Sequence, residues 1–578
     1  MDKQTLKQRI DVAAGRAPAD LRIANCRVVD VYNKAVFPAD VLISGGYIAG
    51  WGAPDFPEAR EVFDAGGAYI APGLIDSHVH IESSHLSPAE FSRLVVPHGT
   101  TTVVADPHEI CNVCGLDGFD YMLRASEHTA LQVFLQVPSC VPCTPFENAG
   151  ATLDAKEIAK RIGLERVLGL GEMMNFVGVC AADGEILDKL MEAARAGKLV
   201  DGHSPALSGH MLDAYAAAGI RTDHECATPD ELRDRVRRGI YVLLRQGTSC
   251  HDVLNLLPGV TGDNERLCLF CTDDRQSASL IEEGHIDNNI RLAVGAGLDP
   301  LTALRMATIN AAECYGLRDR GAVAPGKRAD LILFEDLNDL RVKEVWVAGR
   351  HVASRGAYLS EDVRVAPEGV SGRMNVRDFS AARLALTLKS DRVRTIQICL
   401  GSVVTGEGRA AVRRDAAGRW QRDGQDIVKI AVVERHKGTG NVGLGLLEGY
   451  GLKNGAVATS VAHDSHNIIV AGDSDDDMAL AVQRLIEMGG GMAIAQNGRL
   501  LGSLEHEIAG LMTDRPGEWV AGEIARLCEI AGNALGIHAD IDPFMALCFM
   551  ALPVIPALKI TDTGLFDVNA FRTVPVEA

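Results

Sequence analysis

The spacing of apolar positions divides the chain into three stretches of different character. Residues 21–63 contain short runs of strand length, and one of them, residues 35–43, precedes the turn signal Gly45-Gly46. From Pro72 onward, such runs alternate with segments of helical spacing, a pattern typical of βα units around a parallel sheet. From about Ala366 the alternation stops and the two kinds of segment mix, which indicates a further α+β unit.

The alternating stretch contains eight apolar runs that we predict to be strands. They cover residues 74–78, 101–106, 131–137, 167–171, 199–203, 221–224, 241–245 and 267–272. Segments of helical spacing lie between them, at residues 88–96, 155–162, 185–196 and 229–238. Eight such strands predict a (β/α)8 barrel, in which the chemistry takes place at the carboxyl ends of the strands.

A helical segment at residues 300–312 is followed by a return to strands and turns, at residues 321–333 and 345–350. We expect these strands to complete the β domain begun near the N-terminus. The predicted fold class is α/β, with a (β/α)8 barrel inserted in a small β-sandwich domain and followed by a C-terminal α+β domain. The predicted bounds are 1–71 and 316–365 for the β domain, 72–315 for the barrel and 366–578 for the last domain.

Side chains that can bind metal or move protons follow six of the eight predicted strands. They are His78 and His80, then Asp106-Pro107-His108-Glu109, then Glu172, His203, His224 and Asp273-Asp274. His78 and His80 are two residues apart, so on a strand they point to the same face. Scattered surface residues would not fall so regularly at strand ends, and we therefore predict a metal site there.

The residue types suggest how two divalent ions would be held. His78, His80 and Asp273 would bind one ion, His203 and His224 a second, and Glu172 would bridge them. Nitrogen and oxygen ligands suit iron(II), manganese(II) or zinc. Two cations sharing a water would give hydroxide at neutral pH, and Asp273 could pass its proton to a leaving group. This predicts a hydrolase for an amide, a cyclic amide or an amidine-like ring carbon.

Composition excludes some classes of partner. The net charge of −20 argues against nucleic acid or an anionic membrane surface, which both need a basic footprint. No run reaches 18 apolar residues and no signal-like segment opens the chain, so we expect neither a membrane span nor a leader. The 14 scattered cysteines fit reduced thiols, and we expect a cytoplasmic location.

Three further motifs carry less weight. Gly438–Gly443 matches a dinucleotide fingerprint, but residues 444–451 contain too much glycine for the helix that should follow. Three Cys-x-x-Cys pairs could indicate a zinc site like that of the compact zinc nucleobase deaminases. However, Ile110, Ser139 and Leu267 replace the proline expected before each first cysteine. The cluster His463-Asp464-Ser465-His466-Asn467 is either a polar loop or part of a site.

The chain resembles the amidohydrolase superfamily and, within it, most closely the adenine deaminase family. The motifs that carry the resemblance are Pro-Gly-Leu-Ile-Asp-Ser-His-Val-His at residues 72–80 and those at residues 78–84, 99–110, 271–275 and 463–468. Many superfamily members bridge their metals with a carboxylated lysine on the fourth strand. Here Glu172 stands at that place, as is expected of the adenine deaminase family.

The resemblance implies the conversion of adenine and water to hypoxanthine and ammonia, by attack of hydroxide on C6, in purine salvage. It also implies two iron or manganese ions per chain and a homodimer or larger oligomer. Candidate catalytic residues are Asp273, Asp106 and Glu225, and candidate substrate-binding residues are His108, Glu109, Glu82 and Ser84. We expect the C-terminal domain to act as a lid or dimer contact over the barrel mouth.

Two alternatives remain open. A cyclic amidase or deacetylase could use the same scaffold, but it would usually need the bridging lysine or a phosphate-binding Arg or His pair. A non-catalytic assembly protein would have lost metal ligands, whereas every ligand position is filled.

Overall fold

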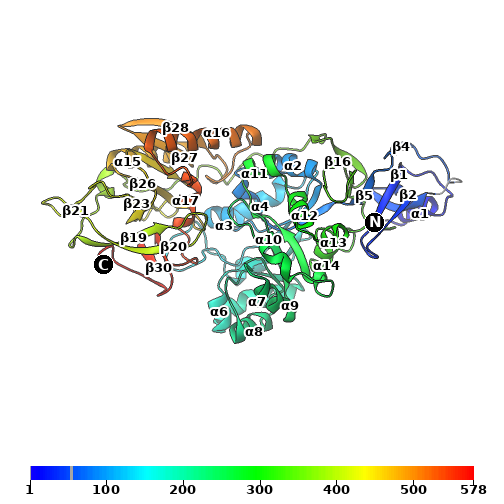
Figure 1. Ribbon diagram of the computed structural model, residues 1–578, viewed down its shortest axis with the longest axis horizontal. Helices are drawn as coiled ribbons and strands as arrows, with labels where there is room; N and C mark the ends of the chain where they lie inside the picture. The colour runs from blue at the N-terminus through cyan, green and yellow to red at the C-terminus, as the bar shows by residue number, and fades with distance from the viewer. Residues whose placement is uncertain (1, 53–55) are drawn as a thin grey trace.

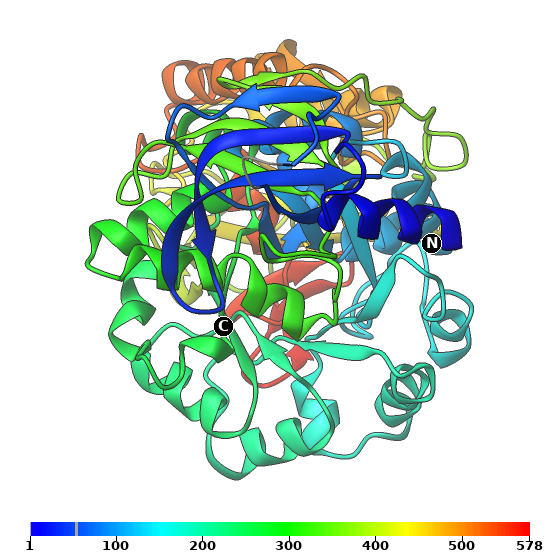
Figure 2. The same ribbon diagram turned by 90° about the vertical axis from the view of Figure 1, so that its right-hand side faces the viewer.

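A computed structural model of this chain describes residues 2–52 and 56–578. Three parts follow one another along its longest axis (Figure 1). The first strands lie at one end, the barrel occupies the middle, and the last domain lies at the other end. Figure 2, viewed from the end that carries the N-terminus, shows the first strands in front of the rest.

Eight parallel strands at the predicted places form the barrel. They are β6 (Leu74–His80), β7 (Thr100–Ala105), β8 (Gln132–Val137), β9 (Val167–Met173), β10 (Leu199–Gly202), β11 (Thr222–Asp223), β12 (Tyr241–Arg245) and β13 (Cys268–Cys271). β6 to β10 pair in chain order, as do β11 to β13, and a bridge between Val200 and Ile220 joins the two groups. The short strand β14 (Asp273–Asp274) pairs in parallel with β6 and closes the ring, which confirms the predicted barrel.

Helices surround the strands on the outside of the barrel. They are α2 (Pro88–Val95), α3 (His108–Cys114), α4 (Leu116–Ala125), α5 (Ala155–Ala159), α6 (Phe176–Cys180), α7 (Gly184–Ala196), α8 (Gly209–Ala217), α9 (Pro229–Arg237), α10 (Val253–Leu256), α11 (Ser277–Glu283), α12 (Ile286–Gly295), α13 (Pro300–Met306) and α14 (Ile309–Cys314). The helix predicted at residues 300–312 is two helices, because Thr308 has a non-helical backbone and donates its hydroxyl to the carbonyl of Leu304.

The small β domain is built from both sides of the barrel. Helix α1 (Lys3–Ala13) precedes it, and its strands are β1 (Leu21–Asp30), β2 (Ala35–Ser44), β3 (Tyr47–Gly52), β4 (Glu61–Asp64), β5 (Tyr69–Pro72), β15 (Leu331–Phe334), β16 (Val342–Val347), β17 (Arg350–Ser354) and β18 (Ala357–Tyr358). All nine belong to one hydrogen-bonded sheet. β15 lies antiparallel to β5, with Leu331 opposite Pro72, so the barrel is inserted between two segments of this sheet.

The C-terminal domain has an eight-stranded sheet with helices. The sheet contains β19 (Arg392–Ile398), β20 (Thr405–Ala411), β23 (Ile427–Val433), β24 (Val442–Glu448), β25 (Ala456–Thr459), β26 (Ile468–Gly472), β27 (Gly491–Gln496) and β28 (Arg499–Glu505). The other elements are β21 (Arg413–Arg414), β22 (Trp420–Gln421), β29 (Leu558–Thr561), β30 (Gly564–Asp567), β31 (Arg572–Thr573), α15 (Asp475–Met488), α16 (Gly517–Ile530) and α17 (Pro543–Met550). Gly443 lies in β24, so a strand stands where a dinucleotide site would need a helix.

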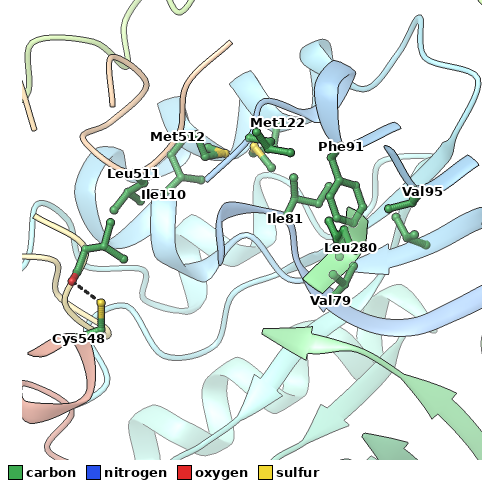
Figure 3. Close-up of a cluster of buried hydrophobic side chains, with 14 of the residues drawn as sticks. Val79, Ile81, Phe91, Val95, Ile110, Met122, Leu280, Leu511, Met512 and Cys548 are labelled. Atoms are coloured by element: carbon green, nitrogen blue, oxygen red, sulfur yellow. Dashed lines mark hydrogen bonds between the residues drawn. The ribbon is translucent and has the colours of Figure 1, made fainter. Parts of the chain in front are cut away.

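Apolar side chains form a continuous core between the barrel and the C-terminal domain. Ile110 and Met122, from α3 and α4, lie beside Leu511 and Met512 of the C-terminal domain (Figure 3). All four side chains are almost completely buried. Helix α16 also packs against α2 and α11. Because buried apolar side chains of both parts pack together here, the junction holds the C-terminal domain against the barrel.

No helix within residues 2–52 and 56–578 combines the length and the apolar character that crossing a bilayer requires. The 14 cysteines are all free thiols.

Two stacked histidines lie within the junction. His85 and His506 have ring centroids 4.9 Å apart, and both are buried. Both nitrogens of His506 lack a hydrogen-bond partner in the described structure. Burial lowers the pKa of His85 to about 4 and that of His506 well below its usual range. Both rings are therefore neutral in the folded chain at neutral pH.

This pair predicts that acid weakens the junction. In the unfolded chain each histidine takes up a proton near pH 6.5, so the unfolded state binds more protons as the pH falls from about 6.5 toward 4. The free energy of unfolding should fall across that window. In His506→Phe the fall should be shallower, as measured by the melting temperature between about pH 7 and 4.5. An identical pH dependence in wild type and variant would contradict this.

Candidate metal centre and active-site cavity

The six predicted ligands converge at the carboxyl ends of the barrel strands. His78 and His80 come from β6, Glu172 from β9 and Asp273 from β14, while His203 and His224 directly follow β10 and β11. All six are buried. The backbone of Asp273 has φ of 58°, a left-handed conformation that aspartate tolerates better than most residues and that often marks functional sites.

Three of these side chains face one point. The Nε2 atoms of His78 and His80 are 3.2 Å apart. Asp273 Oδ1 lies 3.6 Å from the first and 3.1 Å from the second. Two imidazole nitrogens and one carboxylate oxygen at these spacings can ligate a single divalent ion.

Glu172 connects this group to a second one. Its Oε1 lies 3.4 Å from His80 Nε2, while its Oε2 lies 2.7 Å from His203 Nδ1 and 3.3 Å from His224 Nε2. One carboxylate therefore contacts both groups with different oxygens. This is the arrangement that a bridging ligand between two cations requires.

The outward-facing nitrogens test whether these histidines fit a metal. His78 Nδ1 lies 3.2 Å from Asp201 Oδ2, and His80 Nδ1 lies 2.9 Å from the backbone oxygen of Asp106. Both partners are acceptors, so they fix the protons on Nδ1 and leave each Nε2 free to ligate. Ligating histidines are usually oriented in this way. The donor set therefore fits divalent metal ions.

Asp106, predicted to be catalytic, has a different position. Its Oδ2 accepts the backbone N–H of Glu172 at 2.9 Å. Gly171 leaves room for it, because a Cβ there would lie only 2.2 Å from the same oxygen. Asp106 is fully buried and is not among the described residues that line the cavity. It therefore supports the backbone of Glu172, and its catalytic role stays a prediction.

The predicted substrate-binding residues divide into two pairs. His108 and Glu109 line the cavity. Glu82 instead accepts the backbone N–H of Ile110, and Ser84 donates to the backbone oxygen of Ile81. Neither belongs to the cavity lining in the described chain, and their hydrogen bonds hold the turn that follows β6. Their roles in substrate binding stay predictions.

Glu225 faces the cavity as predicted, and its partner is a residue that the sequence analysis missed. Arg245, the last residue of β12, donates through Nη1 to Glu225 and, at 2.9 Å, to Asp273 Oδ2. Arg245 thus ties the carboxylates that follow the sixth and eighth strands. Its position at the end of the seventh strand was the available signal, since the metal ligands were recognised by the same criterion.

Comparison with known proteins agrees with this geometry. The Amidohydrolase family model matches residues 69–352, and the Adenine deaminase C-terminal domain model matches residues 402–572. The chain is 52% identical over 579 residues to Adenine deaminase 2 of Desulfotalea psychrophila, with 100% of each chain covered. It is 53% identical to an adenine deaminase of Nitratidesulfovibrio vulgaris, over 98% of each chain, and 46% identical to one of Ligilactobacillus salivarius, over 99% of each. The chain belongs to the adenine deaminase family.

In this adenine deaminase family member, the C-terminal domain also reaches the cavity. Asp464 Oδ1 lies 3.7 Å from His108 Nε2, and His463 Nδ1 lies 3.6 Å from Glu109 Oε1. His463 and Asp464 both line the cavity. The polar cluster that the sequence left open as loop or site is therefore part of the site's surroundings.

In the metal-free centre, contacts between carboxylates and imidazoles shift the pKa values of both. Burial opposes ionisation of Glu172, but contacts with His108 and His203 hold its pKa well below the usual range. In the same way, His78 and His80 outweigh burial and lower the pKa of Asp273. Burial disfavours the charged imidazoles as well, yet the neighbouring carboxylates raise the pKa of His78 to about 10 and that of His203 to about 9.

These shifts predict that metal binding releases protons. At pH 7 the metal-free chain holds protons on His78 and His203, since their pKa values of about 10 and 9 lie above that pH. A ligating imidazole must lose the proton on its ligating nitrogen, so metal affinity should fall as the pH is lowered. Calorimetric titration of the metal-free chain with manganese(II), in buffers of different ionisation enthalpy, should give heats that depend on the buffer. Equal heats in all buffers would contradict the assignment.

Proposed function

We propose that this chain hydrolyses adenine to hypoxanthine and ammonia with the help of two divalent ions. The observation that carries the proposal is the joined pair of ligand groups around Glu172, in a chain that matches named adenine deaminases over its full length. The adenine deaminase C-terminal domain supports the same substrate, because its residues also line the cavity.

The protein residues have distinct tasks in this proposal. His78, His80 and Asp273 would hold one ion, His203 and His224 the other, and Glu172 both. When bound, the two ions supply Lewis acidity that makes a water molecule nucleophilic at neutral pH. Asp273 lies beside this point, and its carboxylate would accept one proton of the attacking water and deliver it to the departing amino group, which leaves as ammonia.

Glu225 is the proposed partner of the ring nitrogen. It lies within 3.7 Å of both His203 and His224 and lines the cavity. Deamination at C6 requires a proton at N1. Burial opposes ionisation of Glu225, but Arg245 and the two histidines hold its pKa below the usual range, so it is a carboxylate at neutral pH. It would therefore take one proton from the attacking water and pass it to N1. Arg245 binds Glu225 and Asp273 together, so it fixes the separation of the two proton-transferring groups.

The finer assignments are part of the proposal. Manganese or iron(II) is favoured, and zinc also suits the nitrogen and oxygen ligands. We propose two ions per chain, a homodimer, a cytoplasmic location and a role in purine salvage. No basic surface for nucleic acid is expected, given the net charge of −20.

The direct test is release of ammonia from adenine by protein loaded with manganese(II) under reducing, anaerobic conditions. Formation of hypoxanthine is followed in parallel by its ultraviolet spectrum. The proposal predicts turnover of adenine and none of adenosine or cytosine. Absence of turnover in protein shown to hold two metals per chain would reject the substrate and favour a cyclic amide.

The same assay tests Asp273. Asp273→Asn keeps the shape and one ligating oxygen but removes the basic carboxylate. We expect the fold and most of the metal to be retained and kcat to fall by about 1,000-fold or more. A variant with wild-type kcat would remove Asp273 from proton transfer. Metal content is measured on the same samples, so loss of metal is distinguished from loss of a base.

A further inference from the structure

Both domains line the cavity, and most of its apolar lining comes from the C-terminal domain. The barrel contributes the metal-ligating side chains and Met174, and the C-terminal domain adds the ionisable His463 and Asp464. The C-terminal domain contributes an apolar wall, which we define as Val403, Phe549, Leu552 and Ile555. The ring of Phe549 also stacks on His463, with centroids 5.0 Å apart. An aromatic substrate in this cavity would be bounded by apolar groups on one side and by polar groups on the other, as is usual in small-molecule sites.

The wall is assembled from separate segments. Val403 lies in the loop between β19 and β20, Phe549 lies in the last turn of α17, and Leu552 and Ile555 follow that helix. Leu552 donates its backbone N–H to Phe549, and Ile555 donates to Leu552, each at 3.4 Å. Thr405 exchanges two backbone hydrogen bonds with the residues around Pro556, each 2.9 Å long. Among the described residues, no backbone hydrogen bond joins Phe549 directly to Val403.

One buried lysine makes that connection. Lys559, on β29, is 0% exposed. Its Nζ donates to the backbone oxygen of Val403 at 2.9 Å and to that of Phe549 at 2.9 Å. The second acceptor, at the end of α17, also accepts the backbone N–H of Leu552 at 3.4 Å. Lys559 thus joins the end of the helix to the loop with one ammonium group.

The two hydrogen bonds of Lys559 hold the backbone of the loop and of the helix end. Both of its acceptors in the described structure are carbonyl oxygens, so the side chain is not engaged in an ion pair. Burial lowers the pKa of Lys559 to about 7. An amine donates to two carbonyls in its charged and in its neutral form, so the anchor does not depend on its protonation.

We propose that the apolar wall is the surface on which the substrate base packs, with Phe549 as a specificity-determining residue and Lys559 as the positioning residue that holds it. The inference rests on the proposed function, because it takes a purine base as the ligand. A wall that binds the base equally in the ground state and the transition state affects KM more than kcat.

The first test replaces Lys559 by methionine, which keeps the volume and removes the donors. Lys559→Met should raise KM for adenine by about tenfold while kcat changes by less than about threefold. Metal content should not change. The control is Lys429→Met, since Lys429 is also buried in the C-terminal domain and donates to the carbonyl of Leu384, beside a cluster away from the cavity. Unlike Lys559, Lys429 also forms an ion pair, with Asp475, so its loss should cost at least as much stability. This control should lose thermal stability and keep its KM.

The second test acts on the wall and is independent of whether Lys559→Met folds. Phe549→Ala should raise KM for adenine by about tenfold or more, and Phe549→Leu, which keeps part of the apolar surface, should lie between it and wild type. Wild-type KM in both Phe549 variants would overturn the inference. So would a KM increase in Lys429→Met equal to that in Lys559→Met, because the effect would then be merely structural.

The wild-type assay separates this inference from the proposed function. Adenine turnover by wild type together with unaltered KM in the variants rejects the wall and leaves the function intact. Absence of adenine turnover by metal-loaded wild type rejects the function and the inference with it.

Discussion

The site depends on the position of one carboxylate. Glu172 contacts His80 with one oxygen and His203 and His224 with the other, so it joins the two ligand groups into one centre. Contacts with its backbone set its position. Asp106 binds its backbone N–H, and Gly171 is the residue that lets Asp106 approach. Contacts between the ends of β7 and β9, which lie on either side of β8, thereby hold a carboxylate whose burial would otherwise cost much free energy.

The rest of the molecule can be understood as support for this centre. The barrel ring brings six strand ends together, and β14 completes the ring beside β6 so that Asp273 meets His78 and His80. The C-terminal domain is fixed over the barrel by the apolar junction of Figure 3 and covers the cavity with its own side chains. A dry, covered site strengthens every charge interaction inside it. The expected lid is therefore a packed domain in the described structure.

The sequence predicted the features that depend on local periodicity. His78 and His80 share a strand face because the side-chain period is two, and the remaining ligands were found because each directly follows an apolar run. The position of Asp106 after a strand could not show that its carboxylate binds the backbone of Glu172. Arg245 was missed because a cation at a strand end was not considered as a partner for the carboxylates. Phe549 and Lys559 could not be predicted, since no local pattern records which distant segment covers a barrel mouth.

The central claim is that Glu172 joins two metal ions into one centre. Electron paramagnetic resonance of the chain loaded with manganese(II) tests it most directly, with metal content measured on the same sample. The account predicts two ions per chain with the spectrum of a spin-coupled pair, and loss of that coupling in Glu172→Ala. A spectrum of isolated manganese(II) in the fully loaded wild type, or one ion per chain, would contradict it.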